Sequence, residues 1–290
     1  MKKKLLLCTT FLLGASLFTG CFKRDNLEDI KITTTSYPIQ YITEQLYGDY
    51  STIESIYPLG VDIKNYKLTD KQIKDYSKSS IYIFNGLSQE KDYVVPMFQY
   101  NKNIKIIDTS LSMEYTNDME ELWLDPSNFL MLAQNIKNGL QEYINDHYLK
   151  NEINKKYDEL KVEISNIDAN IKLAVESSSN KTIVVSSDLF KFLEKYGLTV
   201  ISLEENNNLT DKTISDVKQL IKNDQISYIF LKQGEEPNRT IQRLIDQTNV
   251  ETLNFNTLSN ITEEENESNQ NYTTLMNQNI ETLKQELYDE

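Results

Sequence analysis

Histidine, cysteine and glycine are scarce in this chain, and their scarcity excludes several kinds of site. Among 290 residues there are one histidine, two cysteines and eight glycines. The single histidine, His147, excludes most Ser-His and Cys-His catalytic arrangements, and we expect it to be solvated or to cap a helix. The glycines form no P-loop, no G-x-G-x-x-G fingerprint and no G-x-S-x-G elbow. The sequence therefore predicts a protein that is not an enzyme.

Long apolar runs are also missing, except at the N-terminus. Three lysines precede the apolar run Leu5–Phe18, which ends in Phe18-Thr19-Gly20-Cys21. This run is too short to span about 30 Å of hydrocarbon and is typical of a secretory signal peptide. Small residues before a cysteine resemble the bacterial lipobox, which implies lipidation of Cys21; the alternative is an ordinary signal with a chance cysteine. We expect the mature chain to be held on the extracytoplasmic face of the cell membrane through Cys21.

Positive charge is in short supply as well. The formal net charge is −14, and removal of residues 1–20 with their three lysines lowers it to about −17. Such an acidic chain is a poor partner for nucleic acid. Cys8 leaves with the signal and Cys21 is expected to be acylated, so no thiol remains for a disulfide, a zinc cluster or a nucleophile. A mature chain of about 270 residues is long enough for two packed units.

Short apolar runs and helical patterns alternate in two series. This alternation predicts an α/β fold of two (βα) lobes, each with a parallel sheet covered by helices. The predicted strands are 30–35, 52–57, 81–84 and 104–107 in the first series and 182–185, 199–203, 227–231 and 251–255 in the second. The predicted helices are 38–47, 69–77, 188–196, 214–222 and 237–248, whereas the acidic, Asn-rich stretches 204–209 and 262–271 are typical of solvated loops.

Between the two series, apolar residues recur at spacings of four and three. They are Leu149, Ile153, Tyr157, Leu160, Ile164, Ile167 and Ile171. The spacing predicts one long amphipathic helix that joins the lobes, with a coiled-coil dimer as the alternative. We therefore expect a signal peptide at 1–20, a tether at 21–29, an N-terminal lobe at 30–147, an interdomain helix at 148–178 and a C-terminal lobe at 179–290.

Several motifs along the chain resemble, in order and spacing, the solute-binding lipoproteins of zinc and manganese ABC importers (the cluster A-I type). They are Thr34-Thr35-Ser36-Tyr37-Pro38, Tyr57 to Tyr66, Tyr82 to Glu90, Leu122-Trp123-Leu124-Asp125-Pro126, Val184 to Gly197 and Tyr272 to Leu283. The resemblance implies two lobes with a ligand cleft between them and one backbone helix. It also implies zinc or manganese as the solute and an ABC permease in the membrane as the partner. We expect the protein itself to be a monomer.

The metal ligands of that family are replaced in this chain. The resemblance places the family's three histidine slots at Lys64, Glu121 and Ser187 and its carboxylate slot at Asn256. A protonated lysine cannot coordinate a metal, and neutral serine and asparagine oxygens are poor zinc ligands.

We therefore expect the four slots to face one another across the cleft without forming a tight zinc or manganese site. Asp62 and Asp188 could add oxygen ligands if their loops are shifted. The sequence leaves two functions open. One is a receptor with weak or altered metal binding. The other is a degenerate, receptor-like surface lipoprotein that acts as a regulator or interaction protein or binds a non-metal ligand. It also leaves open whether Lys64 and Glu121 form a pair.

Overall fold

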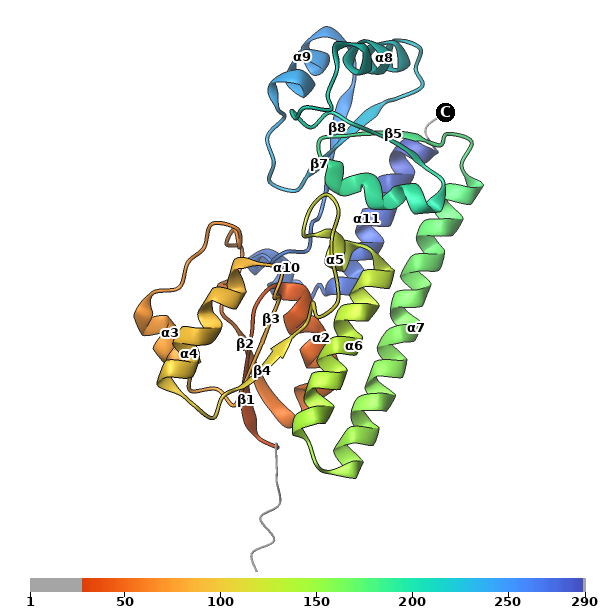
Figure 1. The fold of residues 1–290 in the computed structure, drawn as a ribbon. Helices are drawn as coiled ribbons and strands as arrows, with labels where there is room; N and C mark the ends of the chain where they lie inside the picture. The colour runs from red at the N-terminus through yellow and green to blue at the C-terminus, as the bar shows by residue number, and fades with distance from the viewer. Residues whose placement is uncertain (1–27, 289–290) are drawn as a thin grey trace, which may run out of the picture.

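Two separate parallel sheets form the frame of the computed structural model, which describes residues 28–288 (Figure 1). The first sheet has the order β2-β1-β3-β4 and the second the order β6-β5-β7-β8. The strands are β1 (Ile30–Thr34), β2 (Ser51–Ser55), β3 (Ile81–Phe84), β4 (Lys105–Asp108), β5 (Thr182–Val185), β6 (Thr199–Ser202), β7 (Tyr228–Lys232) and β8 (Glu251–Phe255). All eight lie within two residues of their predicted bounds, and the two-lobed α/β prediction is confirmed.

The strand order decides where a ligand can enter each lobe. In both sheets the first strand of the series lies inside the sheet. The second strand lies on one side of it, and the chain then crosses over so that the third and fourth strands lie on the other side. Such a switch point leaves a crevice outside the carboxyl ends of the strands. In the first lobe these ends are Thr34 and Phe84, and in the second they are Val185 and Lys232. The two crevices are the places from which a cleft between the lobes is built.

Helices cover the sheets and connect the lobes. The α-helices are α2 (Tyr37–Tyr47), α3 (Asp70–Tyr76), α4 (Val94–Tyr100), α5 (Glu121–Leu124), α6 (Pro126–Tyr143), α7 (His147–Ser177), α8 (Asp211–Lys222), α9 (Arg239–Gln247), α10 (Glu263–Glu267) and α11 (Tyr272–Leu287). The 3-10 helices are η1 (Gly48–Tyr50), η2 (Gln89–Tyr93) and η3 (Asp188–Tyr196). Thr69 caps α3 in a reciprocal capping box with Gln72, as its sequence position indicates.

The predicted interdomain helix is present as α7, an uninterrupted helix of 31 residues. Asp146 caps its first turn by accepting hydrogen bonds from the backbone N–H groups of Tyr148 and Leu149. Its buried side chains include Leu149, Leu160 and Ile171, and the helix packs against α2, α6 and α11. In Figure 1 the helix runs alongside both lobes. The apolar face is therefore covered within the chain.

Two local predictions differ from the structure, and one helix was not predicted. Residues 188–196 form a 3-10 helix rather than an α-helix, because the buried pairs Leu189-Phe190 and Phe192-Leu193 repeat every three residues. The predicted loop 262–271 contains the short helix α10, whose N-terminus is capped by Thr262 and Glu265 in a capping box. Helix α4 was not predicted, and Met97 is its one buried residue.

The last part of the chain contacts both lobes, because α11 packs against β5 and β8 of the second lobe while the segment 257–272 is hydrogen-bonded to the first. The indole N–H of Trp123 donates to the carbonyl of Thr257 at 2.7 Å, and the hydroxyl of Tyr272 donates to the carbonyl of Trp123 at 2.5 Å. The backbone N–H of Gly60 donates to the carbonyl of Ile261 at 2.9 Å. One apolar core consequently runs through both lobes and includes Trp123 and Tyr272. The exact lobe boundaries stay a prediction.

The predicted signal and Cys21 lie outside the described residues. Between residues 28 and 288, none of the helices combines the length and the hydropathy needed to cross a membrane.

Candidate functional site

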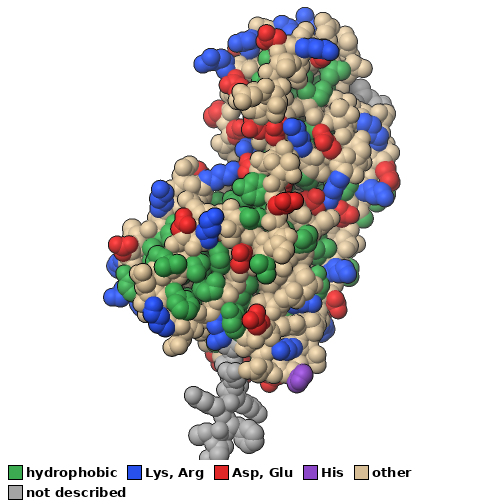
Figure 2. Space-filling model, viewed as in Figure 1, with side chains coloured by type: hydrophobic (Ala, Val, Ile, Leu, Met, Phe, Trp, Pro, Cys, Tyr) green, Lys and Arg blue, Asp and Glu red, His purple; other side chains and the backbone are tan. Residues whose placement is uncertain are grey.

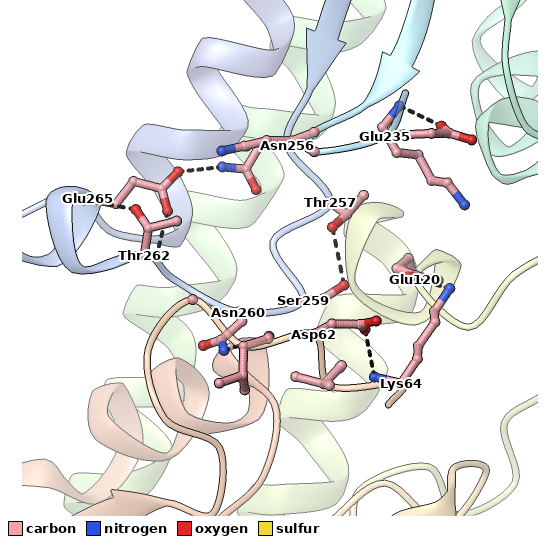
Figure 3. Close-up of a pocket in the computed structure, with 16 residues that line it drawn as sticks. Asp62, Lys64, Glu120, Glu235, Asn256, Thr257, Ser259, Asn260, Thr262 and Glu265 are labelled. Atoms are coloured by element: carbon pink, nitrogen blue, oxygen red, sulfur yellow. Dashed lines mark hydrogen bonds and ion pairs between the residues drawn. The ribbon is translucent and has the colours of Figure 1, made fainter. Parts of the chain in front are cut away.

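A cavity of about 540 Å³ lies where the two lobes meet (Figure 3). The N-terminal lobe contributes the loop Gly60–Lys64 and the side chain of Glu120. The C-terminal half contributes the turn 232–235 that follows β7 and residues from the segment 256–265 that follows β8. Both walls therefore come from segments that follow the carboxyl ends of strands, as the strand order indicates. Figure 2 shows the molecule narrowing at this level, with acidic and basic side chains along the waist.

The loop before Lys64 fixes the position of its backbone. Gly60 has a φ of +71°, a left-handed conformation that few other residues adopt without strain. The Asp62 carboxylate accepts hydrogen bonds from the backbone N–H of Lys64 at 2.9 Å and from the side-chain amide of Asn65 at 2.6 Å. Asp62 therefore lines the cavity, but its two carboxylate oxygens are used to hold its own loop.

The ammonium group of Lys64 is held by two carboxylates. Its Nζ atom lies 2.8 Å from Glu120 Oε1 and 3.1 Å from Asp118 Oδ1. Burial lowers the pKa of Lys64, but the hydrogen bond to Glu120 and the charges of Glu120 and Asp118 outweigh burial and raise it. The side chain is therefore protonated at neutral pH and cannot coordinate a metal.

Asp118 links the two lobes. Its Oδ2 atom lies 3.7 Å from Nζ of Lys232, which ends β7 in the C-terminal lobe. Burial raises the pKa of Asp118, yet the neighbouring Glu120 and the ammonium groups of Lys64 and Lys232 bring it down to about 2. The ionised Asp118 thus lies between two ammonium ions, one from each lobe, in the region where the sequence predicts the ligand cleft.

Glu120 has the least satisfied carboxylate in the cavity. The residue is 3% exposed, and Lys64 occupies its Oε1 atom. Its buried Oε2 atom accepts no hydrogen bond from any residue in the range 28–288. Burial and the nearby Asp118 raise the pKa of Glu120 to about 7. A buried acceptor of this kind is costly to leave without a donor.

On the opposite wall, polar side chains are largely bound to one another. Glu235 Oε2 accepts a hydrogen bond from the hydroxyl of Ser186 at 2.7 Å and from the backbone N–H of Lys232 at 3.1 Å. The Asn256 side chain donates to Glu265 Oε1 at 2.8 Å and accepts from the backbone N–H of Leu258 at 2.8 Å. These contacts fix Asn256 and Glu235 before any ligand arrives.

Two of the four predicted slots do not line the cavity, and the expectation that all four face one another is wrong for them. Glu121 is bound to the preceding loop, because its carboxylate accepts from the backbone N–H groups of Thr116 and Asn117 at 3.1 Å. Ser187 caps η3 through the N–H of Leu189 and donates to Glu204 at 3.1 Å. Their sequence neighbours are the residues connected with the cavity instead. Glu120 lines it, and Ser186 donates a hydrogen bond to Glu235, which lines it.

Of the remaining predicted residues, some line the cavity and others lie outside it. Lys64, Asn256 and Asp62 line the cavity, whereas Asp188 lies outside it and pairs with Lys191 at 2.9 Å. His147, the first residue of α7, is exposed and does not line the cavity. Lys64 pairs with Glu120 and Asp118, which answers the question of its partner that the sequence left open.

Sequence reasoning missed Asp118, Glu120, Lys232 and Glu235. Asp118 and Glu120 stand within three residues of the predicted slot Glu121, but no local pattern indicates which of these carboxylates turns inward. Lys232 had a clearer signal, because it stands at the carboxyl end of a predicted strand. Among residues 28–288, no cluster of three or more His, Cys, Asp or Glu side chains could hold a metal ion. The cavity is lined by four carboxylates, but it also holds two ammonium groups, its other polar side chains are amides and hydroxyls, and it has no histidine, so its lining does not fit zinc.

Comparisons with known proteins find one family and a consistent set of relatives. The family described as "Zinc-uptake complex component A periplasmic" (ZnuA) matches residues 32–286. The zinc-binding lipoprotein AdcA of Streptococcus pneumoniae is 22% identical over 312 residues, covering 98% of this chain and 61% of AdcA, so the chain spans less than two thirds of that relative. The metal ABC transporter substrate-binding lipoprotein SloC of Streptococcus mutans is 24% identical over 270 residues, covering 84% of this chain and 86% of SloC.

Solved structures show the same fold. The Zn(II)-bound ZnuA-like domain of Streptococcus pneumoniae AdcA superposes with a TM-score of 0.72 at 20% identity, covering 90% of this chain and all of that domain. The metal-dependent lipoprotein YcdH of Bacillus subtilis gives a TM-score of 0.73 at 18% identity, again over 90% of this chain and all of YcdH. At these identities the likeness supports the fold of two parallel-sheet lobes and a long helix.

Proposed function

Because the chain belongs to the ZnuA family, whose curated relatives are substrate-binding lipoproteins of zinc and manganese ABC transporters, we propose that it is an extracytoplasmic solute-binding receptor with weak or altered metal binding. The relatives are binding proteins and not enzymes, so this chain is not an enzyme either. An ABC permease is its proposed membrane partner, lipid on Cys21 its proposed anchor, and a monomer its proposed state.

One observation carries the proposal of weak metal binding, namely the ammonium group of Lys64 between Glu120 and Asp118. This group offsets part of the negative charge of the carboxylates that would otherwise attract a cation. A divalent ion about 4 Å from an ammonium, at an effective dielectric constant of about 20, is repelled by on the order of 8 kcal/mol. That repulsion is large enough to offset several good ligands, and the cavity offers no histidine in compensation.

Titration of the metal-free mature chain with Zn²⁺ and with Mn²⁺ tests this function. We expect dissociation constants no tighter than about 10 µM, which corresponds to roughly −7 kcal/mol. The metal content of the purified protein, measured by mass spectrometry, should likewise be far below one ion per chain. A sub-micromolar constant for either metal would overturn the proposal of weak metal binding.

A further inference from the structure

The size of the interlobe cavity suits an organic solute better than a single ion. Its volume of about 540 Å³ falls within the range of roughly 300–1,000 Å³ that is typical of small-molecule sites. A bare transition metal needs only four ligands at about 2.0–2.3 Å. The cavity also carries charges of both signs on facing walls, so the charge of its occupant can be inferred from the groups whose hydrogen-bonding capacity is not filled.

The first of these groups is the buried carboxylate of Glu120. Its Oε1 atom is bound to Lys64 at 2.8 Å, while Oε2 is buried and accepts no hydrogen bond within the described chain. The side chain lines the cavity and is about 5% exposed. A ligand with an N–H donor, above all a charged ammonium group, would satisfy this oxygen.

The second group is the ammonium of Lys232 on the other lobe. Its ion pair with Asp118 spans 3.7 Å, which is longer than a hydrogen bond, and the side chain remains 24% exposed. Lys232 lines the same cavity as Glu120. Its backbone N–H is already bound to Glu235, so the turn that presents the ammonium is fixed. A carboxylate that enters the cavity would find a charged donor here.

The other charged groups limit the net charge of the ligand. A simple cation meets the ammonium groups of Lys64 and Lys232, and a simple anion meets carboxylates that line the same cavity, namely those of Asp62, Glu120, Glu235 and Glu265. Resting on the proposed receptor function, we propose that the cavity binds a small zwitterionic solute of the amino-acid type, with its ammonium group at Glu120 and its carboxylate at Lys232. Thr257 and Ser259, whose hydroxyl groups are hydrogen-bonded to each other at 3.2 Å, line the same cavity (Figure 3).

Calorimetric titration of the mature chain with the common L-amino acids, one at a time, tests the inference. We expect at least one of them to bind and to raise the melting temperature. The N-acetyl derivative of that amino acid lacks the ammonium charge, and its amide lacks the carboxylate, so each should bind about tenfold or more weakly. These comparisons use the unaltered protein and hold even if a cavity variant fails to fold.

Two variants locate the binding groups. Glu120→Gln and Lys232→Met should each weaken binding of the amino acid about tenfold or more. Lys222→Met, at the exposed end of α8 on the same lobe, is the matched control and should leave the affinity unchanged.

The inference is overturned if no amino acid binds, if the N-acetyl and amide derivatives bind as well as the parent, or if folded Glu120→Gln and Lys232→Met variants keep full affinity. Failure of the proposed weak metal binding has a different signature, which is sub-micromolar binding of Zn²⁺ or Mn²⁺. A chain that binds neither metals nor amino acids would refute the inference alone.

Discussion

Lys232 and Asp118 form an ion pair across the two lobes, with 3.7 Å between Nζ and Oδ2. Asp118 also binds Lys64 of its own lobe at 3.1 Å. The carboxylate therefore stands between two ammonium ions in the interlobe region. In this arrangement the attraction that holds the cleft together comes from side chains of the chain itself, and it needs no bound cation.

Replacement of Asp118 should loosen this arrangement. In Asp118→Asn, two ammonium groups lose their shared counter-ion, and we expect a loss of about 2 kcal/mol in the free energy of unfolding, measured with urea. Asp75→Asn is the control, because Asp75 pairs with Lys78 at an exposed position. Equal unfolding midpoints for the two variants would show that the interlobe pair contributes nothing.

Removal of the Lys64 ammonium should restore affinity for cations. Lys64→Ala leaves the carboxylates of Asp118 and Glu120 facing each other without a positive charge between them. We expect Mn²⁺ to bind at least about tenfold more tightly than to the unaltered chain, as measured by calorimetry. Adding Glu120→Gln to Lys64→Ala should reverse the gain. If Lys64→Ala binds Mn²⁺ no better, the lysine is not what keeps the metal out.

The stability of the protein should depend on pH through Glu90. This carboxyl is fully buried, and burial raises its pKa to about 7, although the backbone N–H of Asn85 donates to it at 2.8 Å. Because the folded state binds this proton more tightly than the unfolded state, Glu90 lowers the free energy of unfolding progressively as pH rises from about 4.5 through 7. Glu90→Gln removes this dependence and should stabilise the protein at pH 8 by up to about 3 kcal/mol.

Urea unfolding of Glu90→Gln and of the unaltered chain at pH 5 and at pH 8 checks this expectation. The two proteins should differ little at the lower pH and most at the higher one. A difference that is the same at both values would mean that Glu90 is not protonated in the folded state near neutrality.

The hydroxyl of Tyr272 should stabilise the packing of α11 against the first lobe. It is buried and donates to the carbonyl of Trp123, whose indole N–H in turn donates to Thr257. Tyr272→Phe leaves that buried carbonyl without its partner, so we expect a loss of about 1–3 kcal/mol in the free energy of unfolding. Tyr100→Phe, at an exposed position on α4, should have no measurable effect in the same urea experiment.

Attachment to the membrane should depend on one cysteine. Since the mature chain is acidic and the run before Cys21 resembles a lipobox, we expect the full-length protein to partition into the detergent phase of a phase-separation assay. Cys21→Ser should move it to the aqueous phase. Retention of the serine variant in the detergent phase would refute the lipid anchor.

The sequence by itself determined the elements and their order. Apolar runs placed all eight strands within two residues, and the four-and-three spacing from Leu149 to Ile171 placed the face of α7, because both patterns depend on burial of one side of a regular element. Thr69 marked the start of α3 for an equally local reason, since its side chain caps a backbone group three residues away.

Only the tertiary structure decided which side chains meet in the cavity. Glu120 and Glu121 are neighbours with the same chemistry, yet one lines the cavity and the other binds Thr116 and Asn117, because the short helix α5 turns adjacent side chains to different sides. The pairing of Lys232 with Asp118 depends on two lobes being packed together through α7 and the segment after β8. Such a contact has no local pattern, because its partners come from separate sheets and are brought together by the burial of the core that the lobes share.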